Sequence, residues 1–172
     1  MDEILQKALI EKEKIINSMD TIILSTNDKQ GIPNCSYAPT CIDDDGNFYI
    51  YISELSKHTQ NLLSNDHVSL MIIEDESKAE NIFARKRFTM DGKSKEIIRD
   101  SNEWNNKISL LEGKFKEQIG FLKNLTDFHL FKLTPHEGLL VHGFARAFRL
   151  VGKGLNEIKY LNDKGHTGKK IK

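Results

Sequence analysis

The sequence predicts a mainly β protein with appended helices, of the α+β class, built around a small antiparallel barrel. Three observations predict this class: short β-rich segments recur along the chain, turn-forming residues separate them, and helical periodicity appears only at the start and between strands. The 172 residues contain three prolines and no repeat or low-complexity tract. We therefore expect residues 1–172 to form a single domain.

An N-terminal helix is predicted over residues 2–19, and a hairpin follows it. Apolar side chains recur in this helix at helical spacing among Lys and Glu: Leu5, Leu9, Ile16 and Met19. The run Asn-Asp-Lys-Gln-Gly at residues 27–31 then separates TIILST from IPNCSYAPTCI. Two β-rich segments joined by a loop that contains glycine indicate a β-hairpin.

A second turn is predicted at residues 43–47, DDDGN, before the strand FYIYIS. Three aspartates suggest a calcium loop, but the terminal Glu of such a loop is missing, so a hairpin turn is favoured. The next segment, SELSKHTQNLL, is predicted to be a loop capped by Ser56 and a short helix. The strand HVSLMII follows it.

The longest predicted helix covers residues 100–122, and two strands follow it. Asp100 is placed to cap this helix, with Glu103 three residues further on. A stripe of large apolar residues predicts the face that packs on the sheet: Trp104, Ile108, Leu111, Phe115 and Leu122. The first of the two strands is DFHLFKLTP, and the second, after Glu137-Gly138, is LLVHGFARAFRLV.

The composition argues against several classes of protein. Lys plus Arg and Asp plus Glu both total 25, so the net charge is zero and no overall field favours nucleic acid or an anionic membrane. The N-terminus is acidic and unlike a signal peptide, and the longest apolar runs, residues 22–24 and 70–73, are too short to cross a bilayer. We expect a cytoplasmic protein without nucleic-acid or membrane partners, with Cys35 and Cys41 as reduced packing residues.

The C-terminal segment, residues 153–172, is predicted to be a flexible basic tail. From residue 143 onward, eight Lys or Arg stand against two Asp or Glu, a balance that is typical both of an anion-binding segment and of a solvated terminus. His166 lies in this tail between Gly165 and Gly168, whose backbone freedom suits a segment that must reach over a flat ligand. By its spacing alone, an isolated terminal histidine usually has no function.

A first candidate binding site is formed by Lys57, His58 and Thr59, where a strand passes into a helix. The free N–H groups of a helix N-terminus, together with a lysine and a hydroxyl, favour a phosphate or a carboxylate. An ordinary polar helix start explains the same residues, and by spacing alone it is the more frequent case.

A second candidate is FARKRFT, residues 83–89, in which an extended strand would place Arg85 and Arg87 on one face. Two adjacent guanidinium groups repel each other unless an anion lies between them, and their planar forks match carboxylate and phosphate oxygens. Paired carboxylates or a phosphoryl group are therefore candidate ligands. The alternative is an edge strand whose charges prevent aggregation.

Several of these blocks together resemble one known family. The run CSYAPTCIDDDGNFYIYISELSKHTQNLLSNDHVSLMIIEDESKAENIFARKRFT, the block DFHLFKLTPHEGLLVHGFARAF and the terminal LNDKGHTGKK are similar to the bacterial heme-utilisation proteins of the HutZ/HugZ type. These proteins are split β-barrels related to pyridoxamine phosphate oxidase. The resemblance covers about residues 15–170, and its blocks are specific in combination.

The resemblance implies a homodimer that binds heme at the subunit interface and, in several members, opens the porphyrin with O2 and electrons from a donor. It implies that His166 is the ligand of the heme iron and that Asp127, from the partner subunit, accepts a hydrogen bond from this histidine. A carboxylate on the far ring nitrogen fixes the imidazole tautomer and strengthens its donation to iron. His58 and Arg87 match positions close to the heme.

Two alternatives remain. The related oxidases bind FMN in the same barrel, and FYIYISELSKHTQNLLSN is similar to their strand and phosphate loop, with Lys57 where they often have a lysine. NCSYAP, however, lacks the Arg and Lys with which those oxidases hold the phosphate. A flavin-dependent oxidoreductase and a non-catalytic heme carrier or store are thus the rival functions. Ala145 departs from the resemblance, because glycine is commoner at this position in the family.

Overall fold

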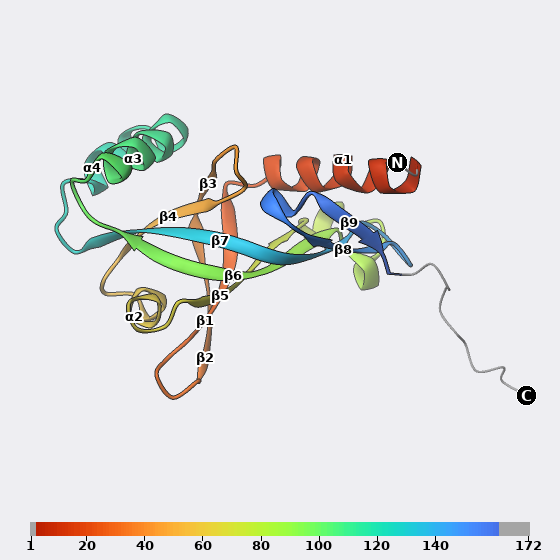
Figure 1. Ribbon diagram of the computed structural model, residues 1–172, viewed down its shortest axis with the longest axis horizontal. Helices are drawn as coiled ribbons and strands as arrows, with labels where there is room; N and C mark the ends of the chain where they lie inside the picture. The colour runs from red at the N-terminus through yellow and green to blue at the C-terminus, as the bar shows by residue number, and fades with distance from the viewer. Residues whose placement is uncertain (1–2, 162–172) are drawn as a thin grey trace, which may run out of the picture.

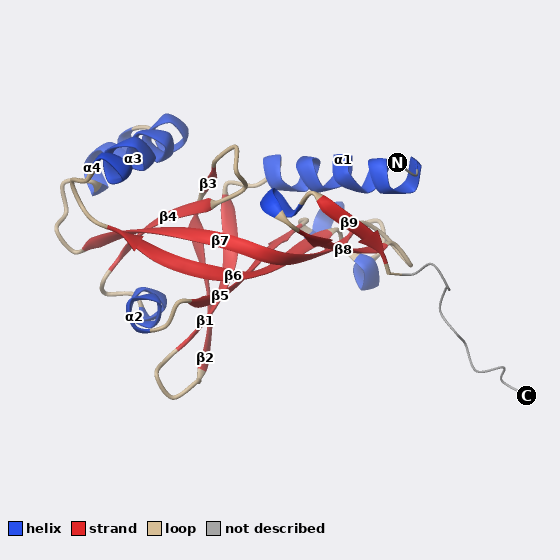
Figure 2. Cartoon of the chain, viewed as in Figure 1, coloured by secondary structure: helices blue, strands red, loops and turns tan. Residues whose placement is uncertain are grey.

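The computed structural model describes residues 3–161, which fold into one curled antiparallel sheet with helices at its two ends (Figures 1 and 2). Within these residues the strand order is β2-β1-β5-β6-β7-β4-β3, and β8 and β9 extend the sheet beside the second half of β7. The predicted mainly β class is confirmed. The strands are β1 (Thr21–Asn27), β2 (Pro33–Pro39), β3 (Cys41–Ile42), β4 (Phe48–Ser53), β5 (His67–Ile73), β6 (Arg87–Ile97), β7 (Phe128–Val141), β8 (Ala147–Val151) and β9 (Glu157–Tyr160).

The helices gather at opposite ends of the sheet (Figure 1). The first helix contacts β5, β6 and β9, whereas α3 and α4 form a helical hairpin at the far end. A short helix, α2, packs on β1 and β2. The α-helices are α1 (Glu3–Asn17), α2 (Lys57–Ser64), α3 (Asn102–Phe115) and α4 (Glu117–Leu122), and the short 3-10 helices are η1 (Glu76–Lys78), η2 (Ile82–Ala84) and η3 (Lys153–Leu155).

The long strand β7 pairs with three other strands of the sheet. It pairs with β6 along one edge; its other edge pairs with β4 up to Leu133 and with β8 from Glu137 onward. Pro135, which has no N–H to donate, lies where this edge changes partner. The register shifts there, and a Cβ on Gly92 of β6 would meet the Thr134 carbonyl oxygen at 2.6 Å, so glycine permits the close approach.

The two strands predicted around Glu137-Gly138 have the wrong boundary. Residues 128–141 form one strand, because the irregularity at Pro135 is absorbed within the sheet. The chain instead turns at residues 142–146, where Gly143 has a φ of 146° and Ala145 a φ of 59°. A positive φ favours glycine, so the backbone conformation of Ala145 is one that an alanine rarely adopts.

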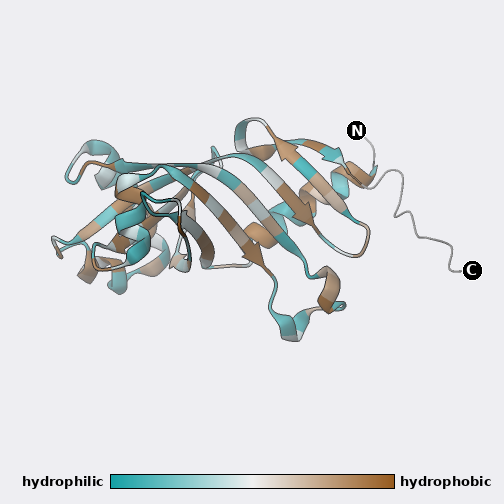
Figure 3. Ribbon diagram, turned by 90° about the horizontal axis from the view of Figure 1, so that it is seen from below, coloured by the Kyte–Doolittle hydropathy of each residue, from teal (hydrophilic) through white to brown (hydrophobic). Residues whose placement is uncertain are grey.

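Two apolar cores lie on the two faces of β4, which is buried along almost its whole length. Phe48, Ile50 and Ile52 belong to the core inside the curled sheet. Tyr49 and Tyr51 point the other way, into the core beneath α3 and α4. Figure 3 shows the corresponding alternation of apolar and polar residues along the strands.

The helix predicted over residues 100–122 is two helices. The chain breaks at Lys116, whose φ is 47°, between α3 and α4. The cap was also predicted one residue too early: the hydroxyl oxygen of Ser101 accepts from the Trp104 backbone N–H at 3.1 Å. The predicted apolar stripe is confirmed, because Trp104, Ile108 and Leu111 are buried and Phe115 and Leu122 pack against them.

The predicted flexible tail starts too early. Residues 153–155 form η3, and β9 pairs with β8 over residues 157–160, so the chain belongs to the sheet as far as Tyr160. Residues 157–160, EIKY, alternate charged and apolar side chains as a half-buried strand does, and the prediction overlooked this short pattern. His166 lies outside the described residues. The N-terminal helix, predicted over residues 2–19, ends earlier, at Asn17.

The two cysteines differ in burial. Cys41 is buried and its pKa is raised by this burial to about 11, which agrees with a packing residue. Cys35 is exposed on β2, so the expectation that it packs in a core was wrong. No helix within residues 3–161 combines the length and the apolar character that crossing a bilayer requires.

Candidate functional site

Asp127 stands at the entry to β7, next to the end of β4. The backbone N–H of Glu54 donates to the Asp127 carbonyl oxygen at 2.7 Å, which continues the ladder between the two strands. The Ser53 hydroxyl donates to Oδ2 of the Asp127 carboxylate at 2.9 Å. Both the backbone and the side chain of Asp127 are therefore hydrogen-bonded at the C-terminal end of β4, to Glu54 and Ser53. We call this region the Asp127 end of β7, and the opposite terminus of the strand the Val141 end.

Thr59, the third residue of the candidate site at the start of α2, is bonded to the same end of β4. Its hydroxyl donates to the Ser53 carbonyl oxygen at 2.6 Å, and the Thr59 side chain is fully buried. The Gln60 side-chain amide donates to the Glu54 carbonyl oxygen at 2.8 Å. The structure thus brings Asp127 and the start of α2 together through Ser53. The buried Thr59 stabilises this contact between β4 and α2, and its hydroxyl is already hydrogen-bonded within the chain.

Arg99 fixes the loop that presents Asp127 from the other side. Its guanidinium donates to the Tyr51 hydroxyl at 3.1 Å and to the Leu125 carbonyl oxygen at 2.9 Å, and it lies 5.3 Å from the centre of the Trp104 ring. Burial raises the pKa of Tyr51, and the nearby guanidinium of Arg99 opposes this rise. Sequence reasoning missed Arg99 because one arginine in a charged segment carries no signal by spacing.

Lys57 and His58 occupy the first turn of α2, where Ser56 makes no side-chain capping bond. Lys57 is exposed, whereas His58 is half-buried. Burial lowers the pKa of His58, which favours the neutral imidazole. Among residues 3–161, nothing bonds to the buried Nε2 of this ring. A buried ring nitrogen without a partner marks a position where a ligand or a second chain can complete the hydrogen bonding.

The two arginines of FARKRFT do not share a strand face, so that prediction was wrong. Residues 82–84 form η2, and β6 begins only at Arg87. The Arg85 guanidinium turns back to the Glu74 carbonyl oxygen and pairs with the Glu76 carboxylate at 3.1 Å. Arg87 is half-buried and donates to the Arg85 carbonyl oxygen at 3.2 Å. Local partners hold the Arg85 side chain outside β6, which the strand pattern alone did not reveal.

The candidate residues fall into two groups at opposite ends of the sheet (Figure 1). Arg87 pairs with Val141 at the start of β6, whereas Ile97 at its end pairs with Leu130, close to Asp127. Leu161, the last described residue, donates to the Ala147 carbonyl oxygen, and Ala147 pairs with Val141. The chain that leads to His166 therefore leaves the sheet at the Val141 end, with Arg87 and far from Asp127.

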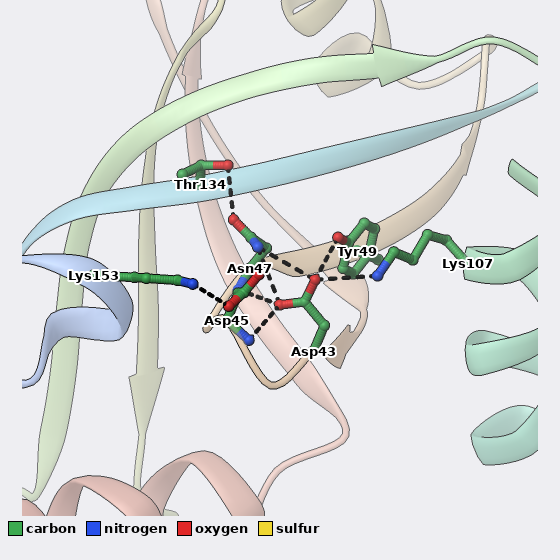
Figure 4. Close-up of polar contacts among 7 residues, drawn as sticks. All are labelled: Asp43, Asp45, Asn47, Tyr49, Lys107, Thr134 and Lys153. Carbon is green, nitrogen blue, oxygen red and sulfur yellow. Dashed lines mark hydrogen bonds and ion pairs between the residues drawn. The ribbon is translucent and has the colours of Figure 1, made fainter. Parts of the chain in front are cut away.

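A second polar centre surrounds Asp43 in the turn before β4 (Figure 4). Oδ1 of Asp43 accepts from the backbone N–H groups of Asp45 and Asn47 at 3.1 and 2.9 Å. Oδ2 accepts from the Tyr49 hydroxyl at 2.7 Å and from the Lys107 ammonium group at 3.1 Å. The bond from Lys107 fastens the turn to α3, so the predicted hairpin turn is confirmed and Asp43 serves the fold.

A cavity of about 340 Å³ adjoins this turn, and Lys12 lines it. The Lys12 ammonium group is buried and donates to the Gly154 carbonyl oxygen at 3.1 Å and to the Asn156 side-chain oxygen at 2.7 Å. Lys12 therefore links α1 to η3 and contributes to the fold. Within the described part of the chain, no group of three His, Cys, Asp or Glu side chains is arranged to hold a metal ion.

Comparison with known proteins identifies the family. A family model described as pyridoxamine 5'-phosphate oxidase matches residues 10–142. Heme oxygenase HutZ from Vibrio cholerae is 42% identical over 146 residues, which cover 85% of this chain and 82% of HutZ.

Solved structures agree with this relationship. The crystal structure of HutZ from Vibrio cholerae, described there as a heme storage protein, matches with a TM-score of 0.71 and 38% identity, covering 86% of this chain and 97% of that one. ChuZ from Campylobacter jejuni matches with a TM-score of 0.85 and 27% identity, covering 96% of this chain and 67% of that one. The predicted split barrel is confirmed, and the chain belongs to the pyridoxamine 5'-phosphate oxidase family as a relative of HutZ.

Proposed function

We propose that this protein binds heme between two copies of the chain and degrades it oxidatively, which releases the iron. In this proposal the protein is a cytoplasmic homodimer that takes electrons from a separate donor. His166 is the iron ligand, and Asp127 of the other copy accepts a hydrogen bond from its imidazole. The relationship to HutZ, described as a heme oxygenase, supports the proposal.

The separation of the two ends of β7 is the observation that carries the proposal. His166 follows Leu161 by five positions, and five residues span at most about 18 Å even when fully extended. The 14-residue β7 is roughly 45 Å long along its path at about 3.3 Å per residue, and it lies between the exit of the tail and Asp127. His166 is therefore too far from Asp127 of its own chain. A pair of these two residues requires a second copy.

The residues at the Asp127 end fit a heme ligated in this way. Ser53 occupies Oδ2 of Asp127, and no other residue of the described chain donates a hydrogen bond to Oδ1. Oδ1 is thus available to an imidazole N–H. The buried Nε2 of His58 lacks a partner on the neighbouring helix turn, which agrees with a ligand or a partner chain approaching this end.

Each side chain has a distinct role in the proposal. The Asp127 carboxylate holds the proton on the far nitrogen of the His166 ring, which keeps one tautomer and makes the ring a better donor to iron. Arg87 of the copy that supplies His166, together with Lys57 and His58 of the copy that supplies Asp127, contacts the anionic groups of the ligand, and Arg85 and Thr59 support the segments that carry them. Heme itself supplies the redox chemistry with O2, and the protein supplies the ligand, the charge balance and the access.

A hybrid dimer tests the pairing across the interface. Two differently tagged chains, His166→Ala and Asp127→Asn, are co-expressed and the mixed dimer is isolated by both tags. If the pair forms between subunits, the hybrid contains one intact site, so half of the wild-type amount of hemin binds with the wild-type spectrum. If the pair forms within one chain, the hybrid has no intact site and behaves like the two parent variants. That second result would overturn the proposal.

A turnover experiment separates an enzyme from a carrier, since HutZ is described both as a heme oxygenase and as a heme storage protein. With ascorbate and O2, an enzyme loses its Soret band as biliverdin absorbance rises. A carrier keeps a stable Soret band under the same conditions.

The FMN alternative rests on the family match and on the exposed Lys57 at an uncapped helix start. A phosphate at this helix start would not bind the Thr59 hydroxyl, because that hydroxyl is buried and already donates to the Ser53 carbonyl oxygen. Flavin fluorescence released on heating the purified protein would favour this alternative over heme.

A further inference from the structure

We propose that Ser53 is a positioning residue that orients the Asp127 carboxylate toward the histidine of the partner chain. This inference rests on the proposed function, because it concerns the acceptor of the His166 hydrogen bond. The resemblance assigns no role to Ser53, and its place in the sequence, at the end of a strand, gives no sign of one. Only the folded chain shows its contact with Asp127.

The direction of the Ser53 hydroxyl is fixed by its neighbours. A hydroxyl has one proton to donate and lone pairs to accept with. The backbone N–H of Leu55 donates to the Ser53 hydroxyl oxygen at 3.2 Å. The hydroxyl proton can then point to Oδ2 of Asp127, which lies 2.9 Å away. The result is a short directed chain from the Leu55 amide through Ser53 to the carboxylate.

Rigid elements hold both ends of this chain. Ser53 is the last residue of β4 and pairs with Phe128, the first residue of β7. Its carbonyl oxygen accepts from the Ser56 backbone N–H at 3.1 Å and from the Thr59 hydroxyl at 2.6 Å. The position of the Ser53 side chain is therefore set by a strand pair and by the first turn of α2.

The consequence concerns which oxygen of Asp127 remains available. A carboxylate at a loop end turns easily about its side-chain bonds, and such turning weakens a hydrogen bond that must cross an interface. With Oδ2 bound to Ser53 and the backbone carbonyl bound to Glu54, the carboxyl group keeps one orientation. Oδ1 is then presented in a constant position. Supporting bonds of this kind hold a functional group to the accuracy that its contact needs.

A matched pair of substitutions tests the role of the hydroxyl. Ser53→Thr keeps the hydroxyl and Ser53→Val replaces it by a methyl group of similar shape, and both β-branched residues are favourable in a strand. Ser56→Ala is the control, because Ser56 lies in the same turn and its side chain makes no capping bond. Thermal unfolding of the heme-free proteins verifies that each variant is folded.

The measurements are the Fe–His stretching frequency of the reduced heme complex and the rate of hemin transfer to apomyoglobin. We expect Ser53→Val to shift the stretching frequency in the direction that Asp127→Asn shifts it, and to raise the transfer rate about tenfold. Ser53→Thr and Ser56→Ala are expected to match the wild type.

Two outcomes would contradict the inference in distinguishable ways. If Asp127→Asn and His166→Ala change both readouts while Ser53→Val changes neither, the role of Ser53 is refuted and the proposed function stands. If none of these variants changes the readouts, the pairing of Asp127 with His166 fails, and the inference fails with it.

Discussion

Asp43 and Asp127 lie at opposite ends of β4 and are used in opposite ways. The Asp43 carboxylate accepts bonds on both oxygens, from two backbone amides, the Asn47 side chain, the Tyr49 hydroxyl and the Lys107 ammonium group. The Asp127 carboxylate accepts one bond from the rest of the described chain, on Oδ2. A carboxylate with hydrogen bonds on both oxygens stabilises the fold. A carboxylate that is held in one orientation by a bond on one oxygen can accept a hydrogen bond from a partner on the other.

The electrostatics of Asp43 agree with its structural role. Burial alone would raise its pKa, but hydrogen bonds from Tyr49, from the Asn47 backbone and from Lys107 hold the pKa well below its usual range. Burial and the bond to Asp43 raise the pKa of Tyr49 above its usual value, so this hydroxyl stays a donor. The comparison predicts large effects on stability at Asp43 and large effects on the ligand at Asp127.

The largest expected effect on stability is that of Asp43→Ala. Removal of the carboxylate leaves the Tyr49 hydroxyl, the Lys107 ammonium group and two turn amides without their acceptor. We expect the free energy of unfolding to fall by about 3 kcal/mol, measured by urea denaturation. Asp44→Ala, an exposed neighbour in the same turn, is the control and should change it by less than about 0.5 kcal/mol. Equal effects of the two variants would contradict a special role for Asp43.

A second prediction concerns pH. Because the folded-state pKa of Asp43 is depressed, its contribution to stability is complete above its unfolded pKa of about 4 and is lost as the pH falls through the folded value. Between pH 5 and pH 2 the wild type should lose about 2 kcal/mol more than Asp43→Asn does. Denaturation curves at both pH values measure this difference, and parallel losses in the two proteins would count against it.

The third prediction concerns one donor of the Asp43 centre. Tyr49→Phe removes the hydroxyl that donates to Oδ2 at 2.7 Å and keeps the ring in its core. Since the bond goes to a charged acceptor, we expect a loss of about 1.5 kcal/mol in the free energy of unfolding. Tyr37→Phe, on the exposed side of β2, is the control. An unchanged stability of Tyr49→Phe would mean that the other donors hold the turn by themselves.

The smallest effect on stability is expected at Asp127. Asp127→Asn keeps an oxygen for Ser53 and the backbone bond to Glu54, so the free energy of unfolding of the heme-free protein should change by less than about 0.5 kcal/mol. Hemin affinity, measured by titration, should fall about 10-fold to 100-fold because the support of the iron ligand is lost. A large loss of stability without loss of affinity would reverse the comparison between the two aspartates.

Local patterns predicted most of the elements. FYIYIS and HVSLMII form β4 and β5 with the expected bounds, and turn residues at 27–31 and 43–47 separate the expected strands. The errors arose where tertiary contacts override the pattern. The register shift between Pro135 and Glu137 is accommodated within a continuous β7. Arg85 binds residues 74 and 76 outside its predicted strand, and pairing with β8 turns part of the expected tail into β9.

The sequence by itself determined the alternation of strands and turns and the apolar stripe of the helices, because these depend on residue type and short-range spacing. Local chemistry also marked His58 and Arg87 as candidates, whereas Asp127 and the role of His166 were predicted from the resemblance to a known family. Only the tertiary structure decided that Ser53 and Arg99 hold Asp127 in place, and that the exit of the tail and Asp127 lie at opposite ends of β7. Contacts between residues far apart in the chain depend on strand register and on the curl of the sheet, and neither is written in the local pattern.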